Sequence, residues 1–178
     1  MYRPAIATFL IFISLTTHDP LSGSEMPGAS MIQPSWDEVH DIVGEICQKI
    51  DPNQIDVLFG VSVGGLVPTA LFSVELENKN VATISARSYV GREQKSLKVA
   101  YGPEKGSIRG KNVLLIDDIV DTGATIRMIK KLLLTEYGAK AVKVASLYVK
   151  ENSPEYPDFW GEEINDWVEF PWECRKSS

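Results

Sequence analysis

Residues 113–125 read V-L-L-I-D-D-I-V-D-T-G-A-T, and this stretch carries the strongest indication of the fold. Its first four residues are apolar, as expected for a strand that is buried on both faces of a parallel sheet. Two adjacent carboxylates, Asp117 and Asp118, follow this strand, and a glycine-containing turn comes next. Residues 124–137 then carry apolar side chains at helical spacing. This order predicts an α/β unit whose polar groups lie at the carboxyl end of a strand, where open parallel sheets bind ligands.

The same alternation continues on both sides of this unit. Apolar runs at residues 55–61, 81–87 and 142–149 predict further strands, and residues 35–50 and 66–77 predict helices. The first helix opens with a capping box, Ser35 to Glu38. Strands that alternate with helices imply right-handed crossovers. We therefore predict an α/β fold with an open, mainly parallel twisted sheet flanked by helices.

Residues 88–109 break this alternation. They are polar, contain glycine, are rich in Lys and Arg, and show no obvious helical or strand periodicity. A segment of this length without its own secondary structure is usually functional or mobile. We therefore expect an irregular loop here.

Composition excludes several classes of protein. The chain has 178 residues, 44% hydrophobic and 24% charged, which is the composition of a globular domain and not of a disordered or coiled-coil protein. The formal net charge of −6 gives no basic footprint, so we expect no nucleic-acid partner. Cys47 and Cys174 form no C-x-x-C pair and read as free thiols in a reducing compartment, which favours a cytoplasmic location.

Residues 1–30 differ from the rest of the chain. The apolar run at residues 5–15 is too short to span a bilayer, which takes about 20 residues, so no stable membrane span is expected. The run follows Arg3 and has the outline of a targeting leader. Three interpretations stay open: a leader, an upstream extension with the true start at Met26 or Met31, or an ordered part of the fold. We assign residues 31–178 to one domain.

The turn after the central strand predicts a phosphate site. Backbone N–H groups at a helix N-terminus and the hydroxyls of Thr122 and Thr125 can cradle a phosphate monoester. The carboxylates of Asp117 and Asp118 can instead accept hydrogen bonds from sugar hydroxyls or hold Mg²⁺. An EF-hand loop is excluded because Met128 stands where it needs glutamate, and no Walker A or dinucleotide motif is present. A plain helix cap would not explain two further adjacent carboxylates.

This stretch resembles the phosphoribosyl-pyrophosphate (PRPP) signature of type I phosphoribosyltransferases. The resemblance implies that the adjacent acids contact the ribose hydroxyls and the metal, which would place Mg²⁺ at Asp118. It implies that the turn binds the 5-phosphate, and that Asp121 lies beside N7 of a purine as the catalytic proton acceptor or donor. The PRPP-binding positions implied in this stretch are Asp117, Asp118, Asp121, Thr122, Gly123, Ala124 and Thr125.

A second stretch, S-V-G-G-L-V-P at residues 62–68, resembles the pyrophosphate loop of the same family. The resemblance implies that the backbone amides of Val63 and Gly64 contact PRPP. Val63 departs from the family pattern, which often has Arg or Lys there, so one cation is missing. Residues 88–109 resemble the family's flexible catalytic loop, in which Lys95 would contact pyrophosphate.

The carboxyl-terminal part resembles bacterial xanthine-guanine enzymes. Lys150 follows the strand at 142–149, where purine relatives place a lysine that donates to the 6-oxo oxygen. The ending D-W-V-E-F-P-W-E, residues 166–173, implies that Trp167 covers the base and that the backbone at Val168 reads its 2-position. It also implies a small C-terminal hood, in which Glu173 assists the metal and Trp172 belongs to the core.

The resemblance implies an enzyme that transfers a phosphoribosyl group from PRPP to a 6-oxopurine base, with Mg²⁺, in purine salvage. It also implies a homodimer or homotetramer. Two alternatives remain at this stage: a non-catalytic PRPP- or nucleotide-sensing regulator, which Val63 favours, and a phosphoribosyltransferase with a non-purine acceptor. The preference among xanthine, guanine and hypoxanthine is not predicted.

Overall fold

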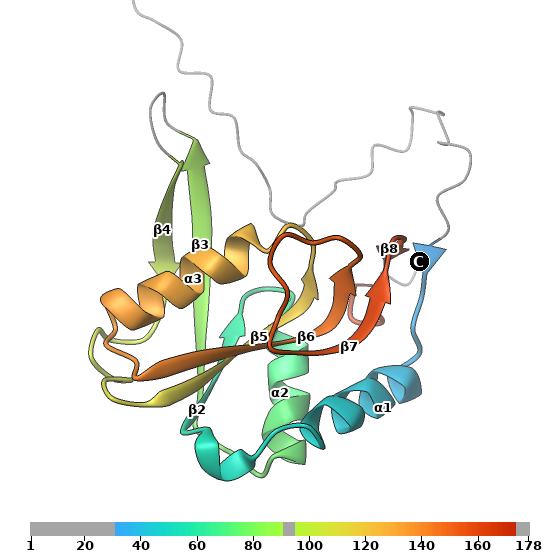
Figure 1. Ribbon diagram of the computed structural model, residues 1–178, viewed down its shortest axis with the longest axis horizontal. Helices are drawn as coiled ribbons and strands as arrows, with labels where there is room; N and C mark the ends of the chain where they lie inside the picture. The colour runs from blue at the N-terminus through green and yellow to red at the C-terminus, as the bar shows by residue number, and fades with distance from the viewer. Residues whose placement is uncertain (1–30, 91–94, 174–178) are drawn as a thin grey trace, which may run out of the picture.

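The structure is a computed structural model that describes the backbone of residues 31–90 and 95–173 and the side chains of residues 31–85 and 101–173. Figure 1 shows a sheet with helices on both faces and a hairpin that projects beyond it. The elements are β1 (Met31–Ile32), α1 (Trp36–Cys47), a 3-10 turn (Pro52–Gln54), β2 (Val57–Val61), α2 (Leu66–Glu75), β3 (Val81–Val90), β4 (Lys95–Tyr101), β5 (Asn112–Val120), α3 (Ala124–Thr135), β6 (Ala141–Lys150), β7 (Phe159–Ile164) and β8 (Trp167–Val168).

The main sheet has six strands in the order β4-β3-β2-β5-β6-β7. All neighbours pair in parallel except β3 and β4, which are antiparallel. This confirms the predicted mainly parallel α/β sheet. The chain runs outward from β2 to β3 and later returns to place β5 on the other side of β2. The switch point of the topology, where open parallel sheets bind ligands, therefore lies between β2 and β5.

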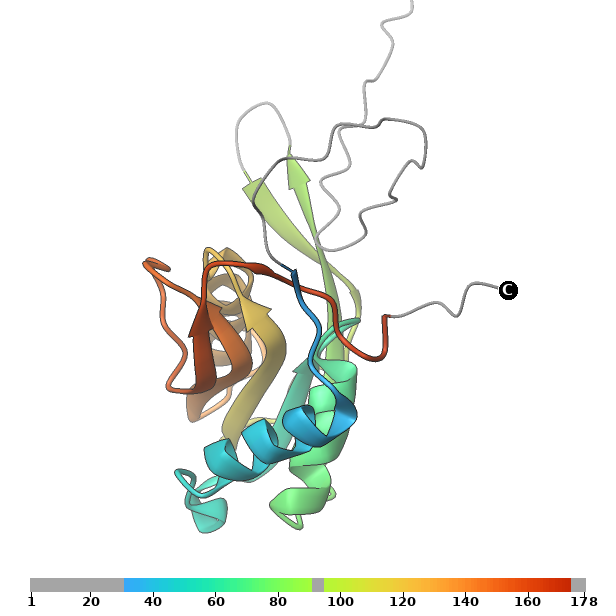
Figure 2. The ribbon, with the colours of Figure 1, turned by 90° about the vertical axis from the view of Figure 1, so that its right-hand side faces the viewer.

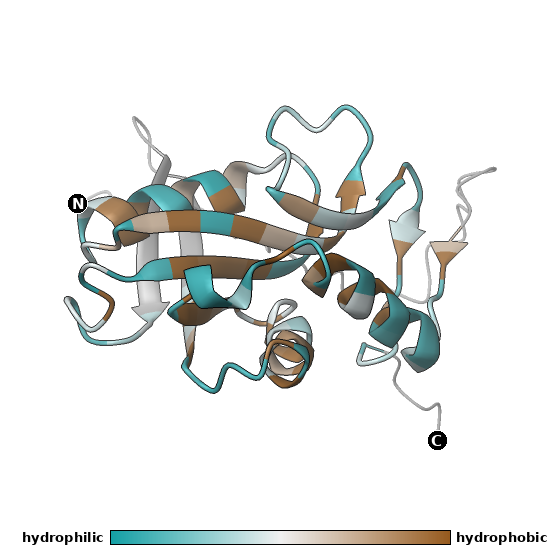
Figure 3. Cartoon of the chain, turned by 60° about the horizontal axis from the view of Figure 1, so that its bottom comes forward, coloured by the Kyte–Doolittle hydropathy of each residue, from teal (hydrophilic) through white to brown (hydrophobic). Residues whose placement is uncertain are grey.

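Two hydrophobic clusters fill the space between sheet and helices. One lies under α1 and α2 and includes Val39, Ile46 and Phe72, all fully buried. The other lies under α3 and includes Ile129 and Leu133. Figure 2 shows α1 and α2 together on their side of the sheet, and Figure 3 shows the hydrophobic colour concentrated on the strands and on α2. The sheet is thus buried on both faces, which explains the continuous apolar runs of its strands.

A local signal sets the start of α1 as expected, but its end differs. The Ser35 hydroxyl accepts from the Glu38 N–H at 3.2 Å, and the Glu38 carboxylate accepts from the Ser35 N–H at 2.7 Å, so the capping box is confirmed. The helix ends at Cys47, short of the predicted residue 50, because the N–H groups of Lys49 and Ile50 donate to carbonyls three residues back instead of four. Asp51 then caps a separate 3-10 turn by accepting from the Asn53 N–H at 3.0 Å.

The expected irregular loop at residues 88–109 is partly wrong. β3 extends to Val90 and pairs with β4, with register from Ser85↔Tyr101 to Val90↔Lys95. Leu97, Val99 and Tyr101 alternate with polar or small residues, a period-two pattern that the polar composition of the segment hides. Much of the segment is therefore an antiparallel hairpin at the sheet edge.

A second, two-stranded sheet joins distant parts of the chain and forms the small C-terminal hood. β1 pairs in parallel with β8, with Met31 opposite Trp167 and Ile32 opposite Val168. The Glu169 N–H also donates to the Ile32 carbonyl at 2.9 Å. Over residues 31–90 and 95–173, no helix is long and apolar enough to cross a membrane.

Candidate active site

The predicted site residues meet at one edge of the sheet, at the carboxyl ends of β2, β5 and β6. β2 and β6 flank β5 on either side, so the loop after β2, the turn after β5 and Lys150 at the end of β6 lie along one line. A Cβ on Gly64 would lie 2.1 Å from the Asp118 Oδ2 atom. Only a glycine leaves room for this approach, so the β2–α2 loop and the paired carboxylates form one site.

Asp117 and Asp118 lie within β5 and not beyond its end, because β6 continues as a pairing partner up to Val120. Their side chains are only 9% and 8% exposed. The Asp117 carboxylate accepts from the Asp118 N–H at 3.1 Å, and the Asp118 carboxylate accepts from the Ile119 N–H at 2.8 Å. These backbone bonds fix both carboxylates in place.

The two carboxylates resist ionisation. Burial and the nearby charge of Asp118 raise the pKa of Asp117 well above its usual value. Burial also raises the pKa of Asp118 to about 6, and the negative charge of Glu173 adds to this rise. None of the ion pairs in the described part of the chain involves either residue. A cation near these groups would relieve the cost of ionising them.

These residues fit a magnesium ion that is shared with a substrate. The Glu173 carboxylate accepts from the Phe170 N–H at 3.2 Å, and its charge acts on Asp118 across the site. No cluster of three or more His, Cys, Asp or Glu able to hold a metal occurs among the described residues. Mg²⁺ usually takes one or two carboxylates and completes its shell with water and substrate phosphates. Asp118, assisted by Glu173, would supply the protein's part.

The turn between β5 and α3 has the geometry of an anion site. Gly123 adopts a left-handed conformation, with φ of 69°, and stands at the N-cap of α3, where it offers no side chain to cap the helix. The Thr122 hydroxyl accepts from the Ala124 N–H at 3.4 Å. Asp121 and Thr122 are exposed. Apart from that long bond to Ala124, the first-turn N–H groups have no side-chain cap from Gly123, and they lie at the positive end of the helix dipole, where an anion is favoured.

The loop after β2 is held by its backbone. The Ser62 N–H and hydroxyl both donate to the Ile84 carbonyl, at 2.9 and 3.1 Å. The Ser62–Val63 peptide bond is cis. A Cβ on Gly65 would lie 2.5 Å from the Ile116 carbonyl, so the loop packs directly on β5. The Val63 side chain is 76% exposed.

Lys150 connects β6 to the hood. Its ammonium donates to the Asn165 carbonyl at 2.9 Å and also to the Asp166 carbonyl. Trp167, the next residue, is 55% exposed, whereas Val168 is buried. Exposure fits a side chain that covers a ligand, and burial fits a residue that contributes its backbone.

The side chain of Trp172 belongs to the described residues, whereas that of Lys95 does not. Trp172 is partly buried and stacks on Phe170 with ring centroids 4.5 Å apart, which confirms its assignment to the core. Lys95 is the first residue of β4, but its side chain lies outside the described residues, so its predicted contact with pyrophosphate stays a prediction.

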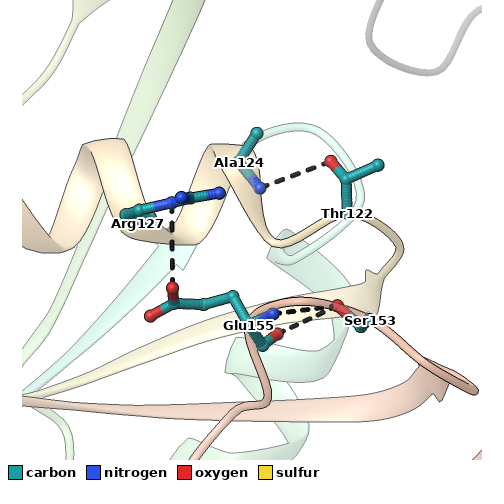
Figure 4. A network of polar contacts seen from close by, with 5 residues as sticks. All are labelled: Thr122, Ala124, Arg127, Ser153 and Glu155. Atoms are coloured by element: carbon teal, nitrogen blue, oxygen red, sulfur yellow. Dashed lines mark hydrogen bonds and ion pairs between the residues drawn. The ribbon is translucent and has the colours of Figure 1, made fainter.

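Sequence reasoning missed the loop that covers the outer side of the turn. Figure 4 shows Ser153 and Glu155, from residues 151–158 between β6 and β7, beside Thr122, Ala124 and Arg127. Glu155 and Arg127 form an ion pair with 3.7 Å between Oε2 and Nε. The sequence carries no motif here; the one available signal is Gly123, whose lack of a Cβ leaves room for a neighbouring segment.

Comparisons with known proteins agree with this geometry. A phosphoribosyl transferase domain model matches residues 32–177. A xanthine-guanine phosphoribosyltransferase of Chromohalobacter salexigens is 31% identical over 141 residues, covering 78% of this chain and 82% of the relative. A second one, from Cereibacter sphaeroides, is 29% identical over 147 residues, covering 78% of this chain and 84% of the relative.

Solved structures give the same result. The purine phosphoribosyltransferase from Pyrococcus horikoshii is 26% identical, with a TM-score of 0.72 over 83% of this chain and 97% of that one. Fold, site and comparisons define a nucleotide-forming transferase class. The chain belongs to the phosphoribosyl transferase domain family, and its curated relatives include xanthine-guanine phosphoribosyltransferases.

Proposed function

We propose that the protein transfers the phosphoribosyl group of PRPP to a 6-oxopurine base, which gives the purine 5′-mononucleotide and pyrophosphate. One observation carries this proposal: the β2–α2 loop and the carboxylates of β5 touch at the topological switch point, where Gly64 faces Asp118 without room for a side chain. Such a site suits a ligand with a phosphate at one end and a diol and diphosphate at the other.

Each part of the site has a role in binding PRPP. The turn at residues 122–125 binds the 5-phosphate through N–H groups at the start of α3. Asp117 and Asp118 accept hydrogen bonds from the ribose hydroxyls once ionised. The backbone amides of Val63 and Gly64 bind the pyrophosphate, and Lys95 contacts it from β4. Mg²⁺, held on the protein side by Asp118 and assisted by Glu173, would neutralise the charge that develops on the leaving group.

The purine binds between β6 and the hood. An ammonium has three donors, and Lys150 uses two on the carbonyls of Asn165 and Asp166, so the third is free for the 6-oxo oxygen. Trp167 covers the ring, and the backbone at Val168 reads the 2-position.

The reaction exchanges one bond at C1 of the ribose. The C1–oxygen bond to pyrophosphate breaks, and the leaving group takes the electron pair. A ring nitrogen of the base bonds to C1, and Asp121 accepts the N7 proton as a general base. The fixed phosphate and base positions supply much of the rate enhancement by holding the reacting atoms together. Closure of the β3–β4 segment over the site would exclude water, which otherwise captures the reactive sugar.

A non-catalytic regulator is the second candidate, and one observation favours it: Val63 places an exposed apolar side chain, and no cation, in the pyrophosphate loop. The curated relatives favour the enzyme. We further propose a cytoplasmic homodimer or homotetramer, based on the cysteine content and the family resemblance.

The experiment that tests the proposal is a pyrophosphate-release assay with PRPP, Mg²⁺ and, in turn, guanine, xanthine, hypoxanthine, adenine and uracil. Turnover with one or more 6-oxopurines is expected and names the substrate. PRPP binding without turnover on any base would overturn the enzyme assignment in favour of the regulator. Turnover with uracil alone would overturn the purine acceptor.

A further inference from the structure

The loop at residues 151–158 presses one acidic residue against the turn proposed to bind the 5-phosphate. A Cβ on Gly123 would lie 2.3 Å from the Glu155 Cβ, 3.0 Å from its carbonyl oxygen and 3.1 Å from its Cγ. Glu155 therefore packs on the turn along its backbone and the base of its side chain. Figure 4 shows this loop beside the start of α3.

Ser153 fixes Glu155 in this place. The Ser153 hydroxyl donates to the Glu155 carbonyl at 3.0 Å and accepts from the Glu155 N–H at 3.4 Å. Ser153 is itself buried. These hydrogen bonds hold the backbone of Glu155, and the contacts of its Cβ and Cγ with Gly123 keep the base of its side chain against the turn.

A carboxylate at this place opposes the proposed function of the turn. A phosphate monoester carries close to two negative charges at neutral pH, and like charges repel over distances of up to about 10 Å at 0.1 M salt. The structure supplies a compensating charge. The Arg127 Nε atom lies 3.7 Å from the Glu155 Oε2 atom, and Arg127 projects from the first turns of α3, just beyond the turn itself.

We propose that Arg127 cancels the charge of Glu155 and thereby keeps the turn at residues 122–125 attractive to the 5-phosphate of PRPP. The inference rests on the proposed function of that turn. Arg127 acts through Glu155 and is a positioning residue for charge, not a catalytic one. The pair sets the affinity for PRPP and leaves the chemical step unchanged.

A purely structural role for the Arg127–Glu155 pair predicts that loss of Arg127 and loss of Glu155 have the same effect. The side chains of Arg127 and Glu155 are 58% and 35% exposed, and exposed ion pairs contribute little to stability. If the pair only held the loop in place, loss of either partner would have the same effect. If charge matters, the two losses act in opposite directions, because one leaves a free carboxylate near the phosphate and the other a free guanidinium.

The test compares steady-state kinetics of the wild-type protein with Arg127→Gln, Glu155→Gln and the double variant. We expect Arg127→Gln to raise the KM for PRPP roughly threefold to tenfold at low ionic strength, with kcat within about twofold. Glu155→Gln should lower the KM for PRPP, and the double variant should return it to near the wild-type value. The increase in Arg127→Gln should shrink as salt is added, because salt screens exposed charges.

The chain offers a matched control. Lys130, on the same helix, pairs with Asp158 of the same loop at 3.7 Å, but Asp158 is not among the groups that press on Gly123. Lys130→Gln should leave the KM for PRPP within about twofold. Equal increases in Arg127→Gln and Glu155→Gln, a salt-independent effect, or the same effect in Lys130→Gln would overturn the charge role. Failure of the wild-type protein to turn over PRPP would instead overturn the proposed function on which it rests.

Discussion

The carboxylate of Asp118 occupies the space that a side chain on Gly64 would need, with 2.1 Å between that Cβ position and Oδ2. The loop after β2 and the strand β5 therefore depend on each other's shape. The β2–α2 loop reaches its place only because Gly64 has no side chain, and Asp118 keeps its orientation through the Ile119 N–H. A change at Gly64 should act on the metal side of the site as much as on the loop.

Gly64→Ala should lower kcat/KM for PRPP by about 10²-fold, because either the loop or the Asp118 carboxylate must move by an ångström or more. Steady-state kinetics with varied PRPP measures the effect. Gly44→Ala is the control: a Cβ there meets nothing within 4 Å, and Gly44 lies inside α1. Alanine in a helix is about 0.5–1 kcal/mol more favourable than glycine, so this control should raise Tm slightly and keep activity. Full activity in Gly64→Ala would contradict the close approach.

Asp118 should make stability depend on pH. The unfolded carboxyl titrates near pH ~4, whereas burial raises the pKa of the folded one to about 6. Between these values the unfolded state loses its proton more readily, so the free energy of unfolding falls as pH rises from about 4 to about 6, and then levels off. Asparagine does not ionise, so Asp118→Asn avoids this fall in the free energy of unfolding. The variant should therefore be more stable than the wild type at pH 7.5 by about 2 kcal/mol.

Thermal unfolding in the presence of EDTA, from pH 4 to pH 8, measures this difference. The stability advantage of Asp118→Asn over the wild type should disappear toward pH 4, as the carboxyl becomes protonated in the unfolded state as well as in the folded one. A constant difference across the range, or a variant that is less stable at pH 7.5, would show that the buried charge is not the cause.

Asp121→Asn should lower kcat by about 10²-fold, because the amide cannot accept the N7 proton. The exposed position of Asp121 makes a folding defect unexpected. PRPP affinity, measured by calorimetry, should stay within about twofold of wild type. A parallel loss of PRPP affinity and of kcat would assign Asp121 to binding instead.

Lys150→Met should raise the KM for the purine at least about tenfold, since it removes the proposed charged hydrogen bond to the base and the two bonds that hold the Asn165–Asp166 corner. The KM for PRPP should change little. Lys143→Met serves as the control, because Lys143 lies near the other end of β6, where its ammonium is 5.4 Å from the Phe159 ring centroid. A rise in the PRPP KM as large as that in the purine KM would argue against a base-specific role.

The sequence carries enough local information to predict the parallel sheet and to place a site at the edge where its strands end. The apolar runs of β2, β5 and β6 are buried on both faces, and each ends at a polar or glycine-rich break that coincides with a site residue. Gly64, Asp118 and Lys150 therefore fall at the same edge by topology alone. The comparisons confirm the family, while the individual roles of these residues stay predictions.

The missed elements depend on contacts between distant residues. β7 contains Gly161 and two glutamates, so it lacks the apolar run that revealed the other strands. β1 and β8 have two residues each, and each forms a strand only by pairing with the other. Likewise Glu155 packs against Gly123, and no spacing rule connects these two residues in the sequence.

The pairing of Met31–Ile32 with Trp167–Val168 ties the segment that we propose to cover the purine to the first residues that the structure describes. Trimming the chain to begin at residue 33 would release β8 from its partner and leave β2, β5 and the phosphate turn intact. Such a shortened protein should still recognise PRPP but discriminate poorly among bases. On this proposal, selectivity for the acceptor base depends on residues 31–32 as well as on residues 166–173.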